Sequence, residues 1–361
     1  MNLFPALEKK YSKEQLSAAQ AQRLAQEIVF GPVVFQVARL MVKWGLFEML
    51  GQAQDGLSLD EMVARTGRPR YVIQVLLESS LTSGTVLLSG DRFELSKTGW
   101  FLLNDTMARV NMDFNHDVNY LGLFRLEEAL EQGTPEGLKV FGSWPTIYEG
   151  LSSLPEQVQK SWFGFDHFYS DGSFPEALEI VFAGKPARLL DVGGNTGRWA
   201  LKCVGFDPDV CVTIMDLPQQ LEMMRQQTKG LPGAERISGH PVNLLDPAVP
   251  FPEDFDAIWM SQFLDCFSEE EVTSILTRAA RSMGRSSRLF IMETFWDRQQ
   301  FEQAAYCLTQ ISLYFTALAN GCSKMYYSGD MLRCVERAGL RPVKIHDGLG
   351  LGHSVVECAL I

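Results

Sequence analysis

Two acidic residues at the ends of apolar runs are the residues best placed to do chemistry. Asp191 ends one run and leads into a turn that contains Gly193, Gly194 and Gly197, while Asp216 ends the next apolar run. Glycines let the backbone approach a ligand closely, and the last of the three lets a helix pack on the strand. A carboxylate at the end of the second strand can accept hydrogen bonds from both hydroxyls of a ribose. The pattern therefore predicts a nucleotide-type cofactor at the carboxyl edge of a parallel sheet.

The acid before the glycines distinguishes between nucleotide cofactors. Dinucleotide folds place their glycines as G-x-G-x-x-G, so that a pyrophosphate lies on the helix N-terminus. Residues 191–197 read D-x-G-G-x-x-G instead, and Asp191 would repel a pyrophosphate. The same carboxylate suits S-adenosylmethionine, which carries a sulfonium and an ammonium group. An ordinary strand-to-helix turn is the alternative interpretation, and the second acid at Asp216 counts against it.

The segment Asp191-Val-Gly-Gly-Asn-Thr-Gly197, together with Met215-Asp216-Leu217-Pro218, resembles the S-adenosylmethionine-dependent O-methyltransferases of the caffeic acid and acetylserotonin class. The resemblance extends over most of the chain, from about Phe35 to Cys358. The family usually has a glycine where this chain has Asn195, a residue type that tolerates left-handed backbone. The resemblance implies cofactor contacts from Asp191, Gly193, Gly194, Gly197, Asp216 and Leu217.

The resemblance also implies cofactor contacts after the third and fourth strands of the sheet. Asn243 would offer its side-chain carbonyl to the adenine amino group, and Leu244 would offer an apolar face. Met260 and Ser261 would line the floor of the site. For Met260 a place in the core is the competing interpretation, because methionine commonly fills apolar cores.

Methyl transfer requires the acceptor to be held on the axis of displacement and, for a hydroxyl, to lose its proton. The resembled family uses a His-Asp-Trp motif after the fourth strand, a Glu after the fifth strand, and a second Glu further on. In this chain Asp265-Cys266-Phe267 falls at the first motif, Glu293 at the first Glu, and Met325 at the second. We therefore predict Asp265 and Glu293 as the catalytic pair, without the family's histidine.

An aspartate is a weaker base than the histidine it replaces. Its unperturbed pKa of about 3.9, against about 6.5 for histidine, corresponds to roughly 3.5 kcal/mol of proton-transfer driving force. Burial of Asp265 beside Glu293 would raise its pKa and recover part of that difference. The alternative interpretation makes Asp265 a loop acid before the helix that starts at Ser268, and Glu293 an exposed acid at a strand end.

The acceptor pocket is predicted from an aromatic-rich stretch at residues 162–170. In the resembled family this segment lies over the cofactor. We take Phe163, His167 and Ser170 as the candidates that reach the acceptor, together with Met325, and expect most of the other rings to pack in the core.

The elements that must position these residues alternate between strand and helix from Arg188 onwards. Apolar runs separated by helical segments predict a parallel sheet with crossover helices. The last two predicted strands are joined by a glycine-rich turn short enough for an antiparallel hairpin at the sheet edge. The fold class is thus α/β, a doubly wound Rossmann-like sheet with an antiparallel last strand. Strands are predicted at 188–192, 211–215, 235–238, 255–260, 287–293, 341–346 and 353–360.

A mostly helical region precedes this sheet. Helices are predicted over 13–28 and 32–50, and a capping box at Ser58-x-x-Glu61 opens a short helix that Gly67 ends. Another helix follows from Arg70, and residues 86–88 and 93–95 predict a β-hairpin. Two short helices and a hairpin describe a winged helix.

A winged helix can bind DNA, but in the resembled family it dimerises. Its recognition helix, residues 69–80, has Arg68 and Arg70 near its start, while its body has no Lys or Arg and carries Glu78. The segment 32–50 is too apolar for a one-sided surface helix, so part of it should be buried against another chain or another domain. We predict a winged-helix dimerisation domain at 1–105, a helical connector at 106–180 that contributes to the acceptor pocket, and a cofactor-binding catalytic domain at 181–361.

Composition and charge limit which partners, cellular compartment and metal sites can be expected. A net charge of −12 argues against a nucleic-acid partner, and no apolar run reaches the roughly 20 residues that span a bilayer. The first twelve residues lack the apolar core of a signal peptide. Seven cysteines without a C-x-x-C pair suggest reduced thiols in the cytoplasm, and five scattered histidines suggest no metal site.

The sequence thus predicts a cytoplasmic, homodimeric methyltransferase that uses S-adenosylmethionine on a small molecule, with oxygen as the favoured acceptor atom. Methylation of nitrogen or carbon, and a non-methylating use of the cofactor, are the alternative enzymatic functions. A cofactor-sensing, winged-helix DNA-binding regulator is the alternative from another class.

Overall fold

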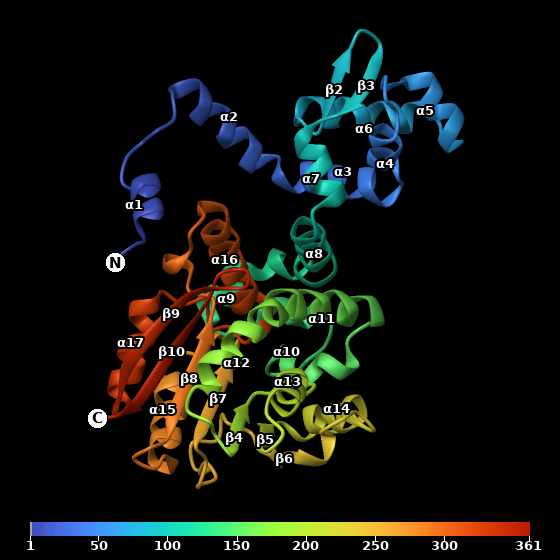
Figure 1. Ribbon diagram of the computed structural model, residues 1–361. Helices are drawn as coiled ribbons and strands as arrows, with labels where there is room; N and C mark the ends of the chain where they lie inside the picture. Colours follow the sequence, from blue (N-terminus) through green and yellow to red (C-terminus); the bar gives the residue numbers. More distant parts are fainter. Residues whose placement is uncertain (1) are drawn as a thin grey trace. The chain divides into compact units, whose positions relative to one another are not determined.

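The computed structural model describes residues 2–361 and divides the chain into two units after Val118 (Figure 1). One unit holds residues 14–118, and the other joins residues 2–13 to residues 119–361. The sequence-based boundaries at 105 and 180 remain predictions.

The smaller unit begins with three helices and then contains a three-stranded antiparallel sheet in the order β1-β3-β2. Ser58 accepts a hydrogen bond from the backbone N–H of Glu61, whose side chain accepts one in return, so the predicted capping box is confirmed. The predicted hairpin is also confirmed, as β2 and β3. The elements are α2 (Ala18–Val29), α3 (Gly31–Lys43), α4 (Leu46–Gly51), β1 (Leu57–Ser58), α5 (Leu59–Thr66), α6 (Arg70–Thr82), β2 (Val86–Ser89), β3 (Arg92–Leu95), α7 (Lys97–Asn104) and α8 (Thr106–Phe114).

Two of the predicted helices have different limits in the structure. The helix predicted over 13–28 begins only at Ala18, because Ser17 caps it in extended conformation. The helix predicted over 32–50 is interrupted at Gly45, whose φ of 69° lies in the left-handed region. Both differences arise from single residues, Ser17 and Gly45, whose effect on the backbone cannot be inferred from the spacing of apolar residues.

The apolar segment divides between the core and the surface. Met41, Leu46 and Phe47 are fully buried in the core of their own unit, whereas Ile28 and Val29 keep 70% and 68% of their surface exposed. Within the described residues no single helix is long and apolar enough to cross a membrane. Among residues 2–361, the pair α2 and α3 reaches that length and composition when taken together, and the two helices meet at a bend of 70°.

The larger unit is built on a seven-stranded sheet in the order β6-β5-β4-β7-β8-β10-β9. Strand β10 runs antiparallel to β8 and β9, and the other neighbours are parallel, so the predicted fold class is confirmed. The strand order reverses between β4 and β7, the position where open α/β sheets bind ligands. The strands are β4 (Arg188–Val192), β5 (Cys211–Asp216), β6 (Ile237–Pro241), β7 (Ala257–Ser261), β8 (Arg288–Glu293), β9 (Leu340–Leu349) and β10 (His353–Leu360).

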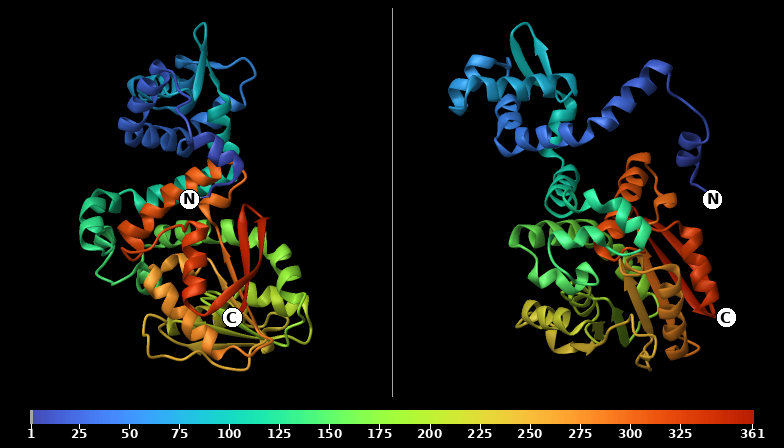
Figure 2. Two further views of the ribbon diagram at one scale, coloured as in Figure 1. Left: turned by 90° about the vertical axis from the view of Figure 1, so that its left-hand side faces the viewer. Right: turned by 180° about the vertical axis from the view of Figure 1, so that it is seen from behind.

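Helices cover both faces of this sheet (Figures 1 and 2). Alternation along each strand separates two cores. Leu189 and Trp259 pack with α12 (Phe174–Phe182), α13 (Arg198–Phe206) and α14 (Pro218–Thr228). Leu190 and Ile258 pack with α15 (Glu269–Ser282) and α17 (Ser328–Arg337).

The remaining helices surround the carboxyl edge of the sheet, and Figure 1 shows α9, α11 and α16 above the strands. Among them, α9, α10 and α11 account for part of the helical character predicted for residues 106–180. These elements are α1 (Pro5–Tyr11), α9 (Leu126–Gln132), α10 (Ile147–Gly150), α11 (Glu156–Ser170) and α16 (Glu302–Tyr314), with short turns that include η7 (Leu264–Cys266).

Candidate active site

Two glycines shape the turn after β4. A larger residue at either position would displace the neighbouring atoms. Gly193 has a φ of 74°, and a Cβ built on it would lie 2.2 Å from the ring of Phe263. A Cβ on Gly194 would lie 2.4 Å from the Asp191 Oδ2 atom. The backbone here therefore lies directly against the Phe263 ring and the Asp191 carboxylate, and it has no room for a side chain at either glycine.

Asp216 connects the end of β5 to this turn. Its Oδ2 accepts a hydrogen bond of 2.8 Å from the backbone N–H of Asn195, and its Oδ1 accepts one of 2.7 Å from Leu217. Asn195 has a φ of 50°, the left-handed conformation that asparagine was expected to tolerate. The structure thus brings Asp191, Gly193, Gly194, Gly197, Asp216 and Leu217 to one corner of the sheet.

The two acids at this corner favour a cationic ligand. Burial raises the pKa of Asp191 to about 8, with repulsion from Asp216 adding to the effect. Burial also raises the pKa of Asp216 to about 6, although its two backbone hydrogen bonds act in the opposite direction. The Oδ2 atom of Asp191 is buried and has no hydrogen-bond partner among residues 2–361. A ligand that brings positive charge and N–H donors would satisfy it, and S-adenosylmethionine fits that requirement.

A pH titration of stability provides a test of Asp191. Because its folded-state pKa is about 8 and an unfolded aspartate has a pKa near 3.9, the ligand-free folded protein holds a proton that the unfolded chain releases between these values. The free energy of unfolding should therefore fall as pH rises from about 4 to 8, by up to about 1.4 kcal/mol per pH unit. Urea unfolding of Asp191→Asn should show a shallower pH dependence than the wild type, and exposed Asp209→Asn should not. Equal slopes for wild type and Asp191→Asn would contradict this assignment.

Two residues after β7 belong to the site although the sequence analysis missed them. Gln262 has a φ of 45°, and its Oε1 is buried without a hydrogen-bond partner in the described structure. Strained backbone of this kind is often retained at binding sites. Phe263 follows it and lies against Gly193. The only available signal was their position after β7, the strand that pairs with β4 where the strand order reverses.

Four residues were predicted to contact the adenine or to line the floor of the cofactor site, and their surroundings in the structure differ. Asn243 uses its Oδ1 to accept a hydrogen bond of 3.0 Å from Leu245 N–H, which closes a local turn. Leu244 and Met260 are buried in the core on the α15 side of the sheet, so for Met260 the competing interpretation as a core residue describes its packing. Ser261 is half-buried at the end of β7. Their contacts with a cofactor remain predictions.

Asp265 and Glu293 are held together by the backbone between β7 and α15. Glu293 ends β8, and its Oε1 accepts hydrogen bonds of 3.1 Å and 2.9 Å from the N–H groups of Phe263 and Leu264. These bonds fix the turn η7, which carries Asp265. The two carboxyl groups are only 4% and 2% exposed, so neither is the exposed loop or strand-end acid of the alternative interpretation.

Burial changes the chemistry of this pair. It raises the pKa of Asp265 above its ordinary value, as the sequence analysis expected. The pKa of Glu293 is raised well above its usual range by burial and by the charge of Asp265. A carboxylate that titrates closer to neutrality is a stronger base than an exposed aspartate.

Met325, the residue predicted at the position of the second acid, contacts Thr294, which follows Glu293 in the chain. It is buried, and its sulfur accepts a hydrogen bond of 3.5 Å from the Thr294 hydroxyl at the end of β8. An apolar thioether therefore occupies the place where the resembled family has a carboxylate.

Helix α11 adds an acid that the sequence analysis missed. Trp162 Nε1 donates a hydrogen bond of 2.7 Å to the hydroxyl of Tyr314 on α16. Asp166 lies one helical turn later on the same face. Burial and the charge of Asp265 raise the pKa of Asp166 to about 7. The i, i+4 spacing of Asp166 from Trp162 was the available signal in the sequence.

The other α11 candidates have different surroundings. Phe163 and His167 stack with ring centroids 5.9 Å apart. Burial lowers the pKa of His167, and the charges that act on it are those of Arg198 and Asp171. Ser170 is buried and donates to Asp171. Asp166, and not His167, is therefore the α11 residue that interacts electrostatically with Asp265.

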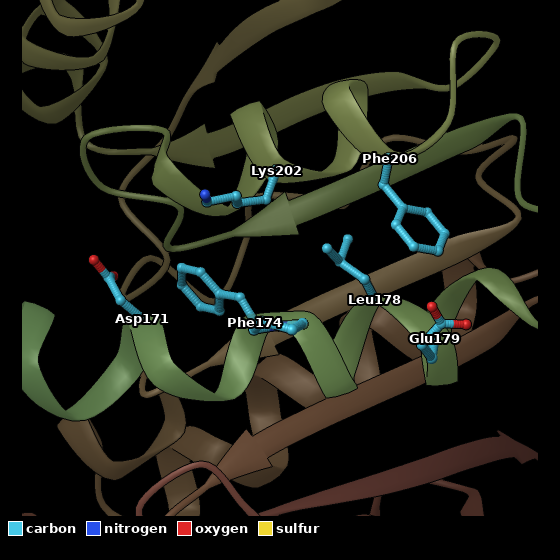
Figure 3. A pocket seen from close by; sticks show the side chains of 7 residues that line it. Asp171, Phe174, Leu178, Glu179, Lys202 and Phe206 are labelled. Carbon is cyan, nitrogen blue, oxygen red and sulfur yellow. The ribbon is translucent and has the colours of Figure 1, made fainter.

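Two other features do not contribute to this site. Within the described part of the chain, no group of three or more His, Cys, Asp or Glu side chains could hold a metal ion. A groove of about 250 Å³ lies between α12 and α13 (Figure 3). Its lining contains none of the candidate residues, so we assign it no role in the chemistry. The lining consists of Asp171, Phe174, Pro175, Leu178, Glu179, Lys202 and Phe206.

Comparisons with known proteins agree with this geometry. Residues 22–93 match the dimerisation2-like domain, and residues 176–339 match the O-methyltransferase domain. The chain is 22% identical to the L-tyrosine C(3)-methyltransferase of Streptomyces lavendulae, over 87% of this chain and 86% of that protein. It is also 22% identical to the acetylserotonin O-methyltransferase of Gallus gallus, over 73% and 77%. The structure of human N-acetylserotonin methyltransferase in complex with S-adenosylmethionine superposes with a TM-score of 0.66 at 17% identity, covering 96% of this chain and 99% of that one.

Proposed function

We propose that this chain transfers the methyl group of S-adenosylmethionine to a small-molecule acceptor, because residues 176–339 match the O-methyltransferase domain and residues 22–93 match the dimerisation2-like domain. The observation that carries the proposal is the unpartnered Asp191 carboxylate beside a glycine turn that Asp216 anchors. When bound, S-adenosylmethionine supplies an electrophilic methyl group on sulfur.

The chain's own residues would then perform three tasks. Asp191 would lie against the positive end of the cofactor, and Asp216 would accept hydrogen bonds from the ribose hydroxyls. The turn held by Glu293 would position Asp265 at the acceptor. Asp265 would take the proton of an acceptor hydroxyl as its oxygen becomes nucleophilic.

Calorimetry tests the cofactor assignment directly. S-adenosylhomocysteine, the demethylated product, should bind at one site per chain, and NAD should not bind. Binding of NAD, or of neither nucleoside, would overturn the proposal. The test needs no knowledge of the acceptor, so it separates the cofactor from the question of substrate.

Transfer to carbon is a second candidate function, and the relationship to an L-tyrosine C(3)-methyltransferase favours it. A phenol deprotonated by Asp265 is nucleophilic at oxygen and at the ring carbon beside it, so the same base could serve both reactions. NMR of a product made with ¹³C-methyl-labelled S-adenosylmethionine distinguishes them, because a methyl group on oxygen and one on carbon have well-separated carbon shifts.

The exposed apolar residues at the junction of α2 and α3 support a homodimer. Ile28, Val29, Phe30 and Val33 are all more than half exposed in the single chain, and an apolar patch of this kind commonly marks an interface. Light scattering at micromolar concentration should give about twice 40.5 kDa. Ile28→Asp with Val33→Asp should shift the mass towards a single chain, and a monomeric wild type would contradict the proposal.

The arginines near the predicted recognition helix do not favour the alternative of a DNA-binding regulator. Arg68 lies over the ring of Trp44, 3.7 Å from its centroid. Arg70 forms an ion pair with Asp60. Both arginines of the recognition helix are thus engaged within their own unit, and a salt-dependent gel shift on duplex DNA remains the direct test.

A further inference from the structure

The first residues of the chain pack on the larger unit, far in sequence from the elements that they contact. Residues 2–13 belong to that unit, whereas residues 14–118 form the other one. Helix α1 packs on α16, and Leu7, in the middle of α1, has no exposed surface. The linker that follows, residues 12–17, is exposed and lies outside the helices and strands. We call residues 2–11 the clasp.

Hydrogen bonds join the clasp to both ends of the segment between β8 and α17. The Phe4 N–H group donates a hydrogen bond of 3.2 Å to the backbone oxygen of Asp297, in the turn that follows β8. The Asn2 N–H group donates one of 2.6 Å to the hydroxyl of Tyr327, directly before α17. The Asp297 carboxylate closes the same junction, because it accepts hydrogen bonds of 2.7 Å and 2.6 Å from the N–H and hydroxyl groups of Ser328.

The segment between β8 and α17 also contacts the turn that carries Asp265. Asn320 donates a hydrogen bond from its Nδ2 to the backbone oxygen of Cys266. The hydroxyl of Tyr326 donates one of 2.5 Å to the backbone oxygen of Phe267. Both acceptors lie in or directly after η7, which contains Asp265. The clasp therefore contacts one side of this segment, and η7 contacts another.

Asn320 ends the helical stretch that begins with α16. This helix continues into the π-helix η9 (Phe315–Ala319), and the Asn320 N–H group donates a hydrogen bond of 3.0 Å to the Phe315 oxygen. The Asn320 Oδ1 atom accepts hydrogen bonds of 3.0 Å and 3.1 Å from the N–H groups of Cys322 and Ser323. Single-turn π-helices are frequent at functional sites. A displacement of α16 would thus be passed to Asn320, and from Asn320 to η7.

The clasp depends on this docking for its own structure. Helix α1 has seven residues, and an isolated helix of that length is not stable in water. Leu7 is its buried residue, so burial of this side chain against the larger unit is the main contact that keeps α1 helical. Loss of that burial should release the clasp as a whole.

We propose that the clasp positions η7, and with it Asp265, by holding the segment between β8 and α17 in place. This inference rests on the proposed function, because it concerns how the proposed base is held. Leu7 is a positioning residue, since it acts through α16 and does not touch the reacting groups. The cofactor corner should be independent of the clasp, because β8 lies two strands away from β4 in the sheet.

Hydrogen exchange in the full-length protein, with and without S-adenosylhomocysteine, tests the clasp. In Leu7→Asp the backbone amides of residues 302–327 and of η7 should exchange about tenfold faster than in the wild type, because loss of a buried leucine changes an opening equilibrium by at least that factor. Peptides that cover the turn at residues 193–197 should exchange at the wild-type rate.

Cysteine alkylation gives a second readout at the turn itself. Cys266 lies next to Asp265, and its Sγ donates a hydrogen bond of 3.4 Å to the Asp265 Oδ1 atom. With iodoacetamide and mass spectrometry, the alkylation rate of Cys266 relative to exposed Cys211 should rise about tenfold in Leu7→Asp. Buried Cys203 on α13 should stay protected, whereas a general loss of stability would expose it as well.

Matched variants assign the effect to the buried leucine. Leu7→Met retains an apolar side chain of similar volume and should keep the wild-type exchange. Leu7→Ala should give a smaller increase than Leu7→Asp, and it keeps the test valid if the aspartate variant folds poorly. Glu8→Gln changes an exposed neighbour in α1 and should have no effect.

Two results would overturn the inference. Unchanged exchange in η7 of Leu7→Asp would show that the clasp does not reach Asp265. Equal acceleration at residues 193–197 would show that Leu7 supports the whole unit and not this turn. Calorimetry measures S-adenosylhomocysteine affinity on the same samples. Failure of the wild type to bind it would overturn the proposed function, whereas normal binding with unchanged η7 exchange would overturn this inference alone.

Discussion

Asp265→Asn is expected to lower kcat by about 10²–10⁴-fold, the usual contribution of a positioned general base. The substitution keeps the shape of the side chain in its buried position but removes its ability to accept a proton. The affinity for S-adenosylhomocysteine should stay unchanged, because Asp265 lies on η7 and outside the turn after β4. Methyl transfer from labelled S-adenosylmethionine measures the rate, and calorimetry measures the affinity.

The pH dependence of the wild-type rate provides an independent check on Asp265. Burial raises its pKa to about 7, and a base must be ionised to act. The rate should therefore rise as pH increases through neutrality, and the Asn variant should lose that rise. Glu270→Gln, an exposed acid in the first turn of α15, is the matched control and should retain the wild-type profile.

Two outcomes would contradict the role of Asp265. Equal losses of rate and of cofactor affinity in the variant would show that the residue is structural. An unchanged rate would show that the acceptor arrives without a proton to lose, and that positioning alone supports the reaction.

Asp216→Ala is expected to weaken binding of S-adenosylmethionine by about 1.5–3 kcal/mol, roughly 10- to 150-fold in Kd. The carboxylate would hydrogen-bond the ribose, and it also holds the N–H groups of Asn195 and Leu217. Its removal therefore takes away a ligand contact and loosens the turn. Calorimetry with S-adenosylhomocysteine measures the change.

Controls separate the two contributions of Asp216. Asp216→Asn retains one acceptor oxygen and should show a smaller loss than the alanine variant. Asp209→Ala removes an exposed aspartate in the loop before β5 and should bind normally. Wild-type affinity in Asp216→Ala would mean that the cofactor does not use the end of β5.

The sequence determined the parts of this protein that depend on local rules. Apolar runs predicted strands that overlap all seven strands of the large sheet. For β4, β7 and β8 the physical reason is burial on both faces, which makes a strand apolar along its length. The third predicted strand, 235–238, only overlaps the edge strand β6 (Ile237–Pro241), which is half exposed and therefore has a weaker apolar pattern. The glycine turn and its two acids could also be recognised in the sequence, because their roles depend on backbone conformation and on the ends of neighbouring parallel strands. The capping box at Ser58 follows from four consecutive residues.

Tertiary structure decided where residues far apart in the sequence meet. Glu293 at the end of β8 holds the turn that carries Asp265 by accepting hydrogen bonds from Phe263 and Leu264, and this contact exists only when β7 and β8 pair in the sheet. The burial that changes Asp265 and Asp191 is likewise a property of the assembled helices and sheet, because the pKa of a carboxyl group depends on all the groups that exclude water from it. Residue types in sequence therefore identified the cofactor corner, whereas the burial of the acids and its effect on their pKa values depend on the packing of separate elements.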